Sequence, residues 1–550
     1  MNNFSSTNRK QVIAKAKNEV FDLLIIGGGI TGAGIALDAA MRGLSVILVE
    51  KNDFASGTSS KSTKLIHGGL RYLKQMELRL VNEVGSERAI VHKNAPHIVI
   101  PEKMLLPIKK NGSLSYNLTS LALWIYDFLA GVKSSESRKM LSKEKTKKIE
   151  PLLKGKNLQG GGLYYEYRTD DARLTIEALK KAAEYSANCT NYTEVLDFVY
   201  KDEKIIGAKV HDSFLDKEYQ IKAKKVVNAT GPWVDLLRTK DASLSGKRLQ
   251  LTKGVHLVID YKKLPVRQAI YFDVGDGRMI FAIPRSGKTY LGTTDTVFNE
   301  DLNRPLTSKA DIAYLLKAIN TTFSKTNLKE SDIESSWSGL RPLIHEDGKS
   351  ASELSRKDEI FYGESGLISI AGGKLTGYRK MAERIVNIVT EQLQQEEGKK
   401  YTVCKTEFER LAGGNFANQE EITDYIIYLT GKAREIKLTI EHIKEWVYRY
   451  GSNTEKILDI AIENNQNRKD IDLLAICSEL HYCIDNEMVT TISDFLIRRS
   501  SRLYFDRPRI KYYIDELQEI LVQKLLLSEA QSQQQKADFM ERYQDSRTFV

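Results

Sequence analysis

Cysteine is scarce in this chain of 550 residues, which contains only four. Cys189, Cys404, Cys477 and Cys483 include no CxxC pair and lie near no cluster of histidines, so the sequence offers no zinc-ligand spacing and we expect no metal site. So few cysteines in so long a chain are typical of a reducing cytosol and exclude a small disulfide-stapled module.

Long hydrophobic runs are also missing. No stretch approaches the roughly eighteen consecutive apolar residues of a membrane-spanning helix. The first twenty residues lack the apolar centre of a secretory signal, and we interpret them as a basic extension that can form a helix. Hydrophobic residues nevertheless make up 41% of the chain, enough for a large core, which excludes a disordered tail or a collagen-like protein.

The excess of positive charge is mild. Lys and Arg number 82 against 72 Asp and Glu, a formal net charge of +10. A basic surface of this kind fits an anionic substrate or an anionic membrane surface. Nucleic acid ranks last, because neither zinc-finger spacing nor an RNA-binding aromatic motif occurs; we expect no nucleic-acid partner.

A short apolar strand followed by glycines occurs three times, around residues 21–32, 225–231 and 367–373. The first of these continues into a helical segment that ends near Gly43 and then into the strand SVILVE, which predicts a βαβ unit with a parallel sheet. We expect all three junctions to meet at one sheet edge, with other material inserted between them. Residues from about 250 to 335 alternate as antiparallel strands do, and the chain beyond 400 has helical periodicity. The last stretch, 530–550, is polar and expected to be frayed.

The spacing Gly27-x-Gly29-x-x-Gly32 follows a strand and opens a helix, as a dinucleotide-binding fingerprint does. The glycines permit a tight turn, close approach to a pyrophosphate and close helix–strand packing, and the helix N-terminus offers N–H groups to phosphate. Glu50, at the end of the next strand, can accept hydrogen bonds from ribose hydroxyls and would repel a 2′-phosphate, which disfavours NADP. The fingerprint alone leaves NAD and FAD open. The two further strand–glycine junctions favour FAD, because an extended flavin nucleotide touches several distant segments and a helix starting near Thr376 could direct its positive end at the flavin ring.

The segment SSKSTKLIHGGLRYL (59–73) extends this pattern. Together with NATGPWVD, LTKGVHLVID, FAIPR, YLGTTDT, SGLRPL, SRKDE and GGKLTGYRKMAE, it strongly resembles the FAD-dependent glycerol-3-phosphate dehydrogenases of the aerobic, bacterial type, and the resemblance covers nearly the whole chain. It implies an α/β fold: a glutathione-reductase-like, Rossmann-type FAD-binding domain, an antiparallel-sheet substrate domain and a C-terminal all-helical domain.

The resemblance further implies oxidation of sn-glycerol 3-phosphate to dihydroxyacetone phosphate, with electrons passed through FAD to membrane quinone. Related oxidases use oxygen and often carry an insertion that is not evident here, which favours the dehydrogenase. The alternatives that stay open are such an oxidase, an amine oxidase of the same fold, and a flavin-containing structural protein.

The domain boundaries expected on this basis are a basic extension at 1–20, an oxidoreductase region at 21–395 and a helical domain at 396–550. Within the oxidoreductase region, we assign about 21–90, 150–245 and 335–395 to FAD binding and about 91–149 and 246–334 to the substrate domain.

The FAD site is expected to contain residues of the fingerprint, of the hydroxyl-rich loop after it and of the later glycine junctions. These residues are Gly27, Gly29, Gly32, Glu50, Lys51, Thr58, Ser59, Ser60, Thr63, Lys64, Gly231, Gly373, Lys374, Leu375 and Thr376.

The substrate calls for a cationic grip on its phosphate and a base for its C2 hydroxyl. Arginine forks suit phosphate because they pair in a bidentate way and stay charged. We expect His67 as general base, since its ordinary pKa of about 6.5 suits that role, and Arg341 as the second catalytic residue. The alternatives that stay open are a structural His67, hydrogen-bonded to flavin or backbone, and His256 as a weaker candidate for the base. The full substrate-binding set is Arg71, Tyr72, His256, Thr294, Arg341, Arg356 and Lys374.

A quinone reductase without a spanning helix must attach to one face of the membrane. Residues 115–133 form an apolar stretch that contains Trp124. We favour a core helix there and keep open an interfacial helix next to a quinone site, where basic charge would help binding to anionic lipid. The expected location is the cytoplasm, at the inner face of the cell membrane; a homodimer is left open.

Overall fold

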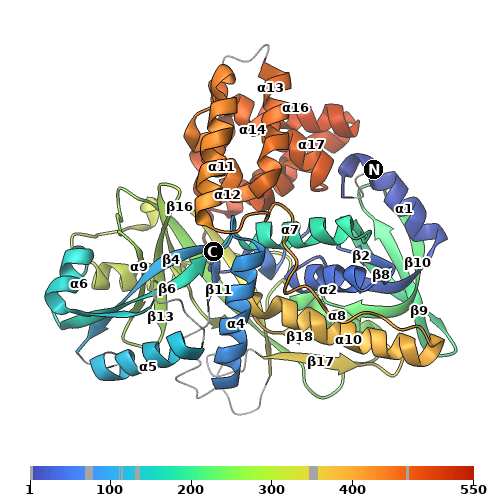
Figure 1. Cartoon of the computed structure of the whole chain (residues 1–550), viewed down its shortest axis with the longest axis horizontal. Coiled ribbons are helices and arrows are strands. Elements are labelled where there is room, and N and C mark those ends of the chain that lie inside the picture. The colour runs from blue at the N-terminus through green and yellow to red at the C-terminus, as the bar shows by residue number, and fades with distance from the viewer. Residues whose placement is uncertain are drawn as a thin grey trace.

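The computed structural model describes residues 4–67, 78–110, 112, 115–129, 137–345, 357–465 and 470–550, without the side chains of 78–80 and 126–129. Two sheets lie side by side with helices packed around them, and a group of helices from the C-terminal part of the chain covers one end (Figure 1). Across the described ranges, every helix is either too short or too polar to pass through a bilayer.

Eight described strands form the first sheet, which is parallel at its centre. In spatial order they are β17 (Asp358–Tyr362), β18 (Ile368–Gly372), β10 (Lys217–Asn228), β1 (Val20–Ile26), β2 (Val46–Val49) and β7 (Asn188–Thr190), with β8 (Thr193–Lys201) and β9 (Lys204–Asp212) continuing from β10 as an antiparallel extension.

The second sheet contains ten described strands and is mostly antiparallel. It comprises β15 (Thr296–Val297), β11 (Leu249–Asp260), β14 (Lys288–Gly292), β13 (Met279–Arg285), β12 (Ala269–Asp273), β4 (Ile100–Lys109), β6 (Leu158–Arg168) and β3 (Leu65–Ile66) in that order, with β16 (Ile333–Ile344) on β11 and β5 (Lys139–Ser142) on β6.

Helices and short helical turns connect these strands. They are η1 (Ser6–Asn8), α1 (Arg9–Asn18), α2 (Ile30–Met41), η2 (Thr58–Ser60), α4 (Leu78–Asn94), α5 (Tyr116–Leu129), α6 (Lys143–Ile149), α7 (Asp171–Glu184), η4 (Gly231–Trp233), α8 (Val234–Lys240), α9 (Lys309–Thr322), η5 (Glu330–Asp332), η6 (Leu375–Gly377) and α10 (Tyr378–Glu397).

The C-terminal part is helical, as its periodicity predicts. It contains α11 (Gln419–Lys432), η7 (Arg434–Ile436), α12 (Ile440–Tyr450), η8 (Gly451–Asn453), α13 (Thr454–Asn464), α14 (Ile471–Asn486), the π-helical turn η10 (Asp494–Arg499), α15 (Arg502–Phe505), η11 (Arg507–Tyr512), α16 (Ile514–Leu525) and α17 (Glu529–Asp545). We call residues 396–550 the C-terminal domain.

The predicted meeting of the three strand–glycine junctions is observed. β1 pairs in parallel with β10 so that Ile26 lies opposite Asn228, and β10 pairs in parallel with β18 so that Asn228 lies opposite Ser369. Because the register aligns their carboxyl ends, the glycines that follow β1, β10 and β18 gather at one edge of the first sheet. Ligands of open α/β sheets bind at such an edge.

The division of the oxidoreductase region stays a prediction, although its FAD-binding segments contribute strands to both sheets: β3, β6 and β16 pair within the second one. Two other expectations about the organisation are wrong in part. The basic N-terminal segment does form a helix, but Arg9 is buried and pairs with Asp212 at 2.8 Å, so it is part of the core. The polar residues 530–550 are not frayed: most belong to α17, where Phe539 is fully buried.

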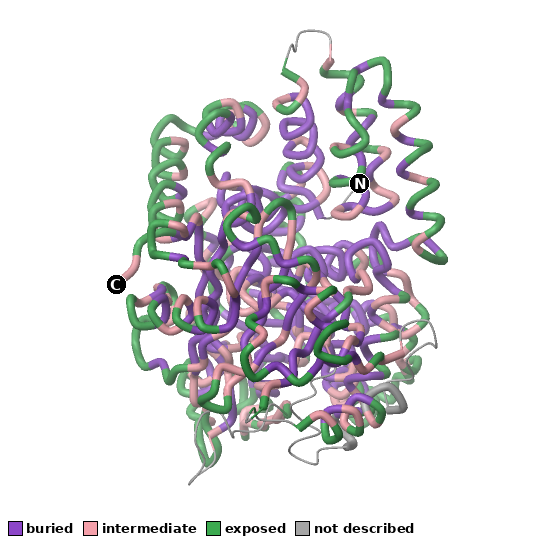
Figure 2. Tube along the Cα trace, turned by 90° about the vertical axis from the view of Figure 1, so that its left-hand side faces the viewer, coloured by how far each residue is buried: buried purple, intermediate pink, exposed green. Residues whose placement is uncertain are grey.

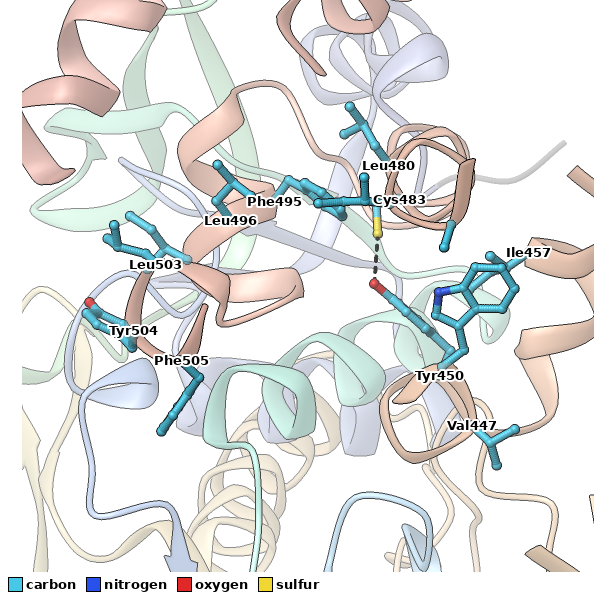
Figure 3. Packing of buried hydrophobic residues seen from close by; sticks show 14 of the residues in the cluster. Val447, Tyr450, Ile457, Leu480, Cys483, Phe495, Leu496, Leu503, Tyr504 and Phe505 are labelled. Atoms are coloured by element: carbon cyan, nitrogen blue, oxygen red, sulfur yellow. Dashed lines mark hydrogen bonds between the residues drawn. The ribbon is translucent and has the colours of Figure 1, made fainter. Parts of the chain in front are cut away.

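The buried residues concentrate where helices cover the sheets (Figure 2). One cluster joins α2, α7 and α10 to the first sheet. Another fills the C-terminal domain, where Tyr450, Cys483 and Phe495 come together and the Tyr450 hydroxyl contacts Cys483 Sγ at 3.3 Å (Figure 3). This second cluster runs on into the second sheet, where it includes Tyr290 and Trp337, so the C-terminal domain shares its core with that sheet.

Helix α5 lies at the end of the molecule opposite the C-terminal helices (Figure 1). Its Leu123 is buried, whereas Leu118, Leu121 and Trp124 are each more than half exposed. A Cβ on Gly162 of β6 would lie 2.6 Å from Leu123, so that glycine lets the helix approach the sheet closely. The preferred expectation of a core helix is thus only half right, because the described part of α5 has an exposed apolar face.

Candidate active site

A cavity of about 1350 Å³ lies between the two sheets. Its wall starts at the glycine edge of the first sheet and continues along β13, β16 and α5. Ordinary small-molecule sites measure about 300–1,000 Å³, so this one has room for a large cofactor and a small substrate together.

The three fingerprint glycines have different structural roles. A Cβ on Gly32 would lie 1.9 Å from the Gly27 carbonyl oxygen, so any side chain there would force α2 away from β1. Gly27 has a φ of +112° and its Cβ would lie 2.6 Å from the Ala229 oxygen. Gly27 and Gly29 line the cavity, whereas Gly32 does not and serves the helix–strand packing behind it.

The Glu50 carboxylate binds backbone N–H groups of the glycine turn and of the loop that follows Glu50. Its Oε2 accepts a 2.8 Å hydrogen bond from the Gly28 N–H and its Oε1 accepts one from Asn52 at 2.9 Å. Burial raises the pKa of Glu50 above its usual range, against the opposing effect of those two N–H groups. The carboxylate lies in the cavity wall beside Lys51, where a ribose could donate to it.

Trp233 belongs to this end of the cavity and was not among the expected residues. Lys51 Nζ lies 4.6 Å from the centre of its ring, and a Cβ on Gly57 would touch that ring at 3.1 Å. Its Nε1 is a buried donor without a hydrogen-bond partner among the described residues. The motif NATGPWVD contains this tryptophan, but no spacing rule marks it as a cofactor contact.

The hydroxyl-rich loop is only partly in the cavity. Thr58, Ser59 and Thr63 line it, and Ser59 Oγ accepts the Ile30 N–H at the start of α2 at 2.9 Å. Ser60 and Lys64 do not line it. Lys64 is buried and forms an ion pair with Asp171 at 2.6 Å, so the expectation that it binds cofactor is not met.

The second and third junctions form another part of the wall. Gly231, after β10, and the residues after β18, Gly373, Lys374, Leu375 and Thr376, all line the cavity. The 3-10 turn η6 precedes α10, so regular α-helix begins at Tyr378, slightly later than expected.

Arg341 lies on β16 and faces the cavity beyond the glycine edge. Its NH2 donates to Thr293 Oγ1 at 2.8 Å, and its NH1 donates to Asp295 Oδ1 and to the Thr294 carbonyl at 3.2 Å. A Cβ on Gly254 would lie 2.2 Å from the guanidinium, so glycine leaves space for it. Asp295, which the sequence reasoning missed, therefore holds the arginine in place. Thr294 itself does not line the cavity and contributes through its carbonyl.

The two histidines differ in exposure to the cavity. His67 lines it, with its ring edge-on to Phe281 at 6.2 Å and its carbonyl accepting from Thr376 Oγ1 at 3.4 Å. His256 does not line it: the ring is 1% exposed, stacks on Trp337 at 4.9 Å and contacts Thr63 Oγ1 at 3.0 Å. Burial lowers the pKa of His256 well below its ordinary value, and Arg341 and Lys64 lower it further. The expected direct contact of His256 with substrate is not met here.

Arg71, Tyr72 and Arg356 lie outside the described residues, and their roles stay predictions. The described part of the wall fits a dinucleotide at one end, where glycines form a cradle and Glu50 and Trp233 lie nearby. At the other end it offers Arg341, Lys374 and His67.

Two family models match the chain. The model described as FAD dependent oxidoreductase covers residues 22–379, and the one described as the C-terminal domain of alpha-glycerophosphate oxidase covers residues 404–532.

Among curated relatives, the aerobic glycerol-3-phosphate dehydrogenase of Bacillus subtilis is 51% identical over 93% of this chain and 92% of its own length. That of Staphylococcus haemolyticus is 51% identical over 96% and 95%. Among solved structures, the glycerol-3-phosphate dehydrogenase from Bacillus halodurans, complexed with FAD, matches with a TM-score of 0.85 at 41% identity over 99% of both chains.

Proposed function

Since the chain belongs to the FAD-dependent oxidoreductase family, among its aerobic glycerol-3-phosphate dehydrogenases, we propose that it oxidises sn-glycerol 3-phosphate to dihydroxyacetone phosphate and passes the electrons to a membrane quinone. Membership confirms the fold class and FAD, both expected from the sequence. The observation that carries the proposal is the single cavity in which the glycine cradle and Glu50 continue into Arg341, Lys374 and His67.

We assign separate roles in the reaction to the residues of the cavity. When bound, FAD supplies a two-electron acceptor for the hydride of C2. Arg341 and Lys374 hold the phosphate dianion, and Asp295 keeps the Arg341 guanidinium oriented, since their ion pair is 3.2 Å long. His67 takes the proton of the C2 hydroxyl at a ring nitrogen. Phe281, against which the His67 ring packs, helps to exclude water from the reacting carbon.

The proposal that a membrane quinone accepts the electrons is supported by the apolar surface of α5. Leu118, Leu121 and Trp124 line the cavity and are also more than half exposed, so one apolar surface joins the cavity to the outside. Tyr271 and Phe281 form the facing wall, stacked at 4.2 Å. We assign this side to the quinone and to contact with the membrane surface, where Trp and Leu partition into the interface. Sedimentation of the protein with vesicles of anionic phospholipid, but not without them, is the expected result.

The test of the proposal is anaerobic mixing of the holoprotein with sn-glycerol 3-phosphate. Bleaching of the flavin absorbance, with dihydroxyacetone phosphate formed in equal amount, is expected, and a stable yellow colour would reject the substrate. His67→Ala should slow the bleaching by about 10²-fold or more, the contribution of a general base. A normal bleaching rate in this variant would remove His67 from proton transfer.

A second candidate is an oxidase acting on the same substrate. It is favoured by the C-terminal family model, which is described from alpha-glycerophosphate oxidase. Reoxidation of the bleached enzyme separates the two. Fast reoxidation by a quinone analogue and slow reoxidation by oxygen are expected of the dehydrogenase, and fast peroxide release would establish the oxidase.

A further inference from the structure

A group of buried charged side chains lies away from the proposed chemistry, between the C-terminal domain and the first sheet. It includes Asp53, which is 1% exposed. Asp53 follows Glu50 in the loop of residues 50–57, which we call the nucleotide loop because Glu50, Lys51 and Gly57 line the cofactor end of the cavity. The carboxylate of Asp53 points away from the cavity, into the C-terminal domain.

Two adjacent arginines of the π-helical turn η10 bind this carboxylate. Arg499 donates from NH1 to Oδ2 at 2.7 Å and from NH2 to Oδ1 at 2.9 Å, a bidentate pair. Arg498 donates to Oδ2 from its Nε. Burial alone would raise the pKa of Asp53, but Arg499 and Arg498 together lower it to about 2, so the carboxylate stays ionised.

A second contact connects η10 to the other side of the nucleotide loop. The Tyr192 hydroxyl donates to Asp494 Oδ1 at 2.6 Å, and Arg498 NH2 donates to the same oxygen at 2.9 Å. The Tyr192 backbone N–H in turn donates to the Asn52 carbonyl at 2.8 Å. The loop is thus held from both sides by one turn of the C-terminal domain.

The nucleotide loop is also held by contacts outside η10: Phe54 is fully buried and stacks on Phe4 at 5.4 Å, and Asn191 Nδ2 donates to Asp53 Oδ1 at 3.1 Å. Glu50 anchors its start through the Gly28 and Asn52 N–H groups, and the Ala55 N–H donates to the Gly28 carbonyl at 2.9 Å. Ala55 also has a φ of +59°, a conformation that costs energy for a residue with a side chain. A loop in such a conformation needs support from outside, and η10 supplies the charged part of that support through Asp53.

We propose that the C-terminal domain acts as a clamp on the nucleotide loop, with Asp53 and Tyr192 as positioning residues that preorganise the loop for FAD. A ligand whose site is ordered in only a fraction of molecules binds more weakly by that fraction. Loss of the clamp therefore weakens FAD binding although neither residue is proposed to touch the cofactor. The inference rests on FAD as the cofactor and is independent of the substrate.

The decisive measurement is the dissociation constant of FAD for the full-length apoprotein, from quenching of flavin fluorescence, without substrate. Tyr192→Phe removes one hydroxyl that bridges the two parts. Tyr450→Phe is the matched control, because its hydroxyl also donates to a buried carboxylate, Glu479 Oε1 at 2.8 Å, but within the C-terminal domain. Tyr192→Phe should raise the dissociation constant by about tenfold, the factor of one charge-assisted hydrogen bond, and Tyr450→Phe should leave it unchanged.

Asp53→Asn removes the charge that Arg498 and Arg499 share and should have the larger effect. If that variant does not fold, the two tyrosine variants still decide. Equal FAD affinities in Tyr192→Phe, Tyr450→Phe and the parent protein would overturn the clamp, as would equal weakening in both variants.

Reciprocity provides a second readout that a merely structural contact would not give. If the clamp favours FAD, then FAD must stabilise the clamp by the same factor. Amide hydrogen exchange in residues 494–499 should slow when FAD binds to the parent apoprotein, and this slowing should be smaller in Tyr192→Phe, which keeps only the Asp53 part of the clamp. Exchange in 494–499 that does not respond to FAD in the parent protein would contradict the proposal.

Discussion

The two ends of the cavity differ in the kind of atoms that line them. The cofactor end consists mostly of backbone: Gly27, Gly29 and Gly373 line it, and Gly32 fixes the helix behind it. The substrate end consists of side chains, above all Arg341, which is held by partners on a separate segment. A backbone site fails when atoms are added to it, whereas a side-chain site fails when a charge or its support is removed. The predictions below test that contrast.

Gly32→Ala should have the largest effect. The added Cβ would lie 1.9 Å from the Gly27 oxygen, and neither α2 nor β1 can shift without disturbing the core. Overpacking of this kind costs about 3 kcal/mol of unfolding free energy or more. We expect the variant to be purified without FAD, as measured by the ratio of flavin to protein absorbance.

Gly431→Ala is the matched control for that substitution. Gly431 lies in α11 with no atom within 4 Å of its added Cβ, and alanine favours helix by about 1 kcal/mol over glycine. Full FAD content is expected. A yellow, stable Gly32→Ala protein would show that the cofactor end tolerates added atoms.

Arg341→Ala should leave FAD bound and raise the KM for glycerol 3-phosphate by about 100-fold, since loss of a charged partner typically costs 2–5 kcal/mol. Steady-state kinetics at constant ionic strength measure this. Arg278→Ala is the control, because Arg278 also lines the cavity but stacks on Tyr314 at 4.2 Å and pairs with Asp276. A KM that is equally affected in both variants would reduce Arg341 to a general source of positive charge.

The contrast also explains what could be predicted from the sequence. The cofactor end was predictable because its glycines stand in local sequence patterns, namely the fingerprint and the three strand–glycine junctions. Parallel pairing of the strands then brings these junctions together. The place of β6 and β16 in the second sheet was not predictable in this way. Their partners, β4 and β11, are distant in sequence, and no local pattern specifies that pairing.

The substrate end depends on such distant pairs. Asp295 was missed because a carboxylate beside an expected anion site looks unfavourable until its pairing with Arg341 is seen. His256 was expected at the substrate although the alternation of its strand left core and cleft open, and β11 is in fact buried along most of its length. Alternation cannot tell the two faces of such a strand apart, and the structure packs His256 against Trp337.

Asp295→Ala should have a smaller effect than Arg341→Ala at the same end. The guanidinium keeps its charge and its contact with Thr293, but loses the carboxylate that fixes its orientation. We expect the KM for glycerol 3-phosphate to rise by about tenfold, the factor of one charge-assisted hydrogen bond, with kcat little changed. Asp295→Asn still offers an acceptor oxygen and should restore most of the affinity. If Asn behaves as Ala does, charge and not orientation is what Asp295 provides.

The smallest effect is expected on the free energy of unfolding, from the charged side chain of Glu50 at the cofactor end. The pKa of Glu50 is raised in the folded protein, so the folded state binds its proton more tightly than the unfolded state does. Stability therefore falls as the pH rises from the unfolded-state pKa of about 4.3 through the raised value. Glu50→Gln removes this titration. The difference in unfolding free energy between parent and Glu50→Gln apoproteins, measured by urea denaturation across that range, should shift in favour of the variant as the pH increases. A difference that is constant with pH would show that Glu50 titrates in the folded protein as it does in the unfolded chain, and that burying its carboxylate has no electrostatic cost in the absence of cofactor.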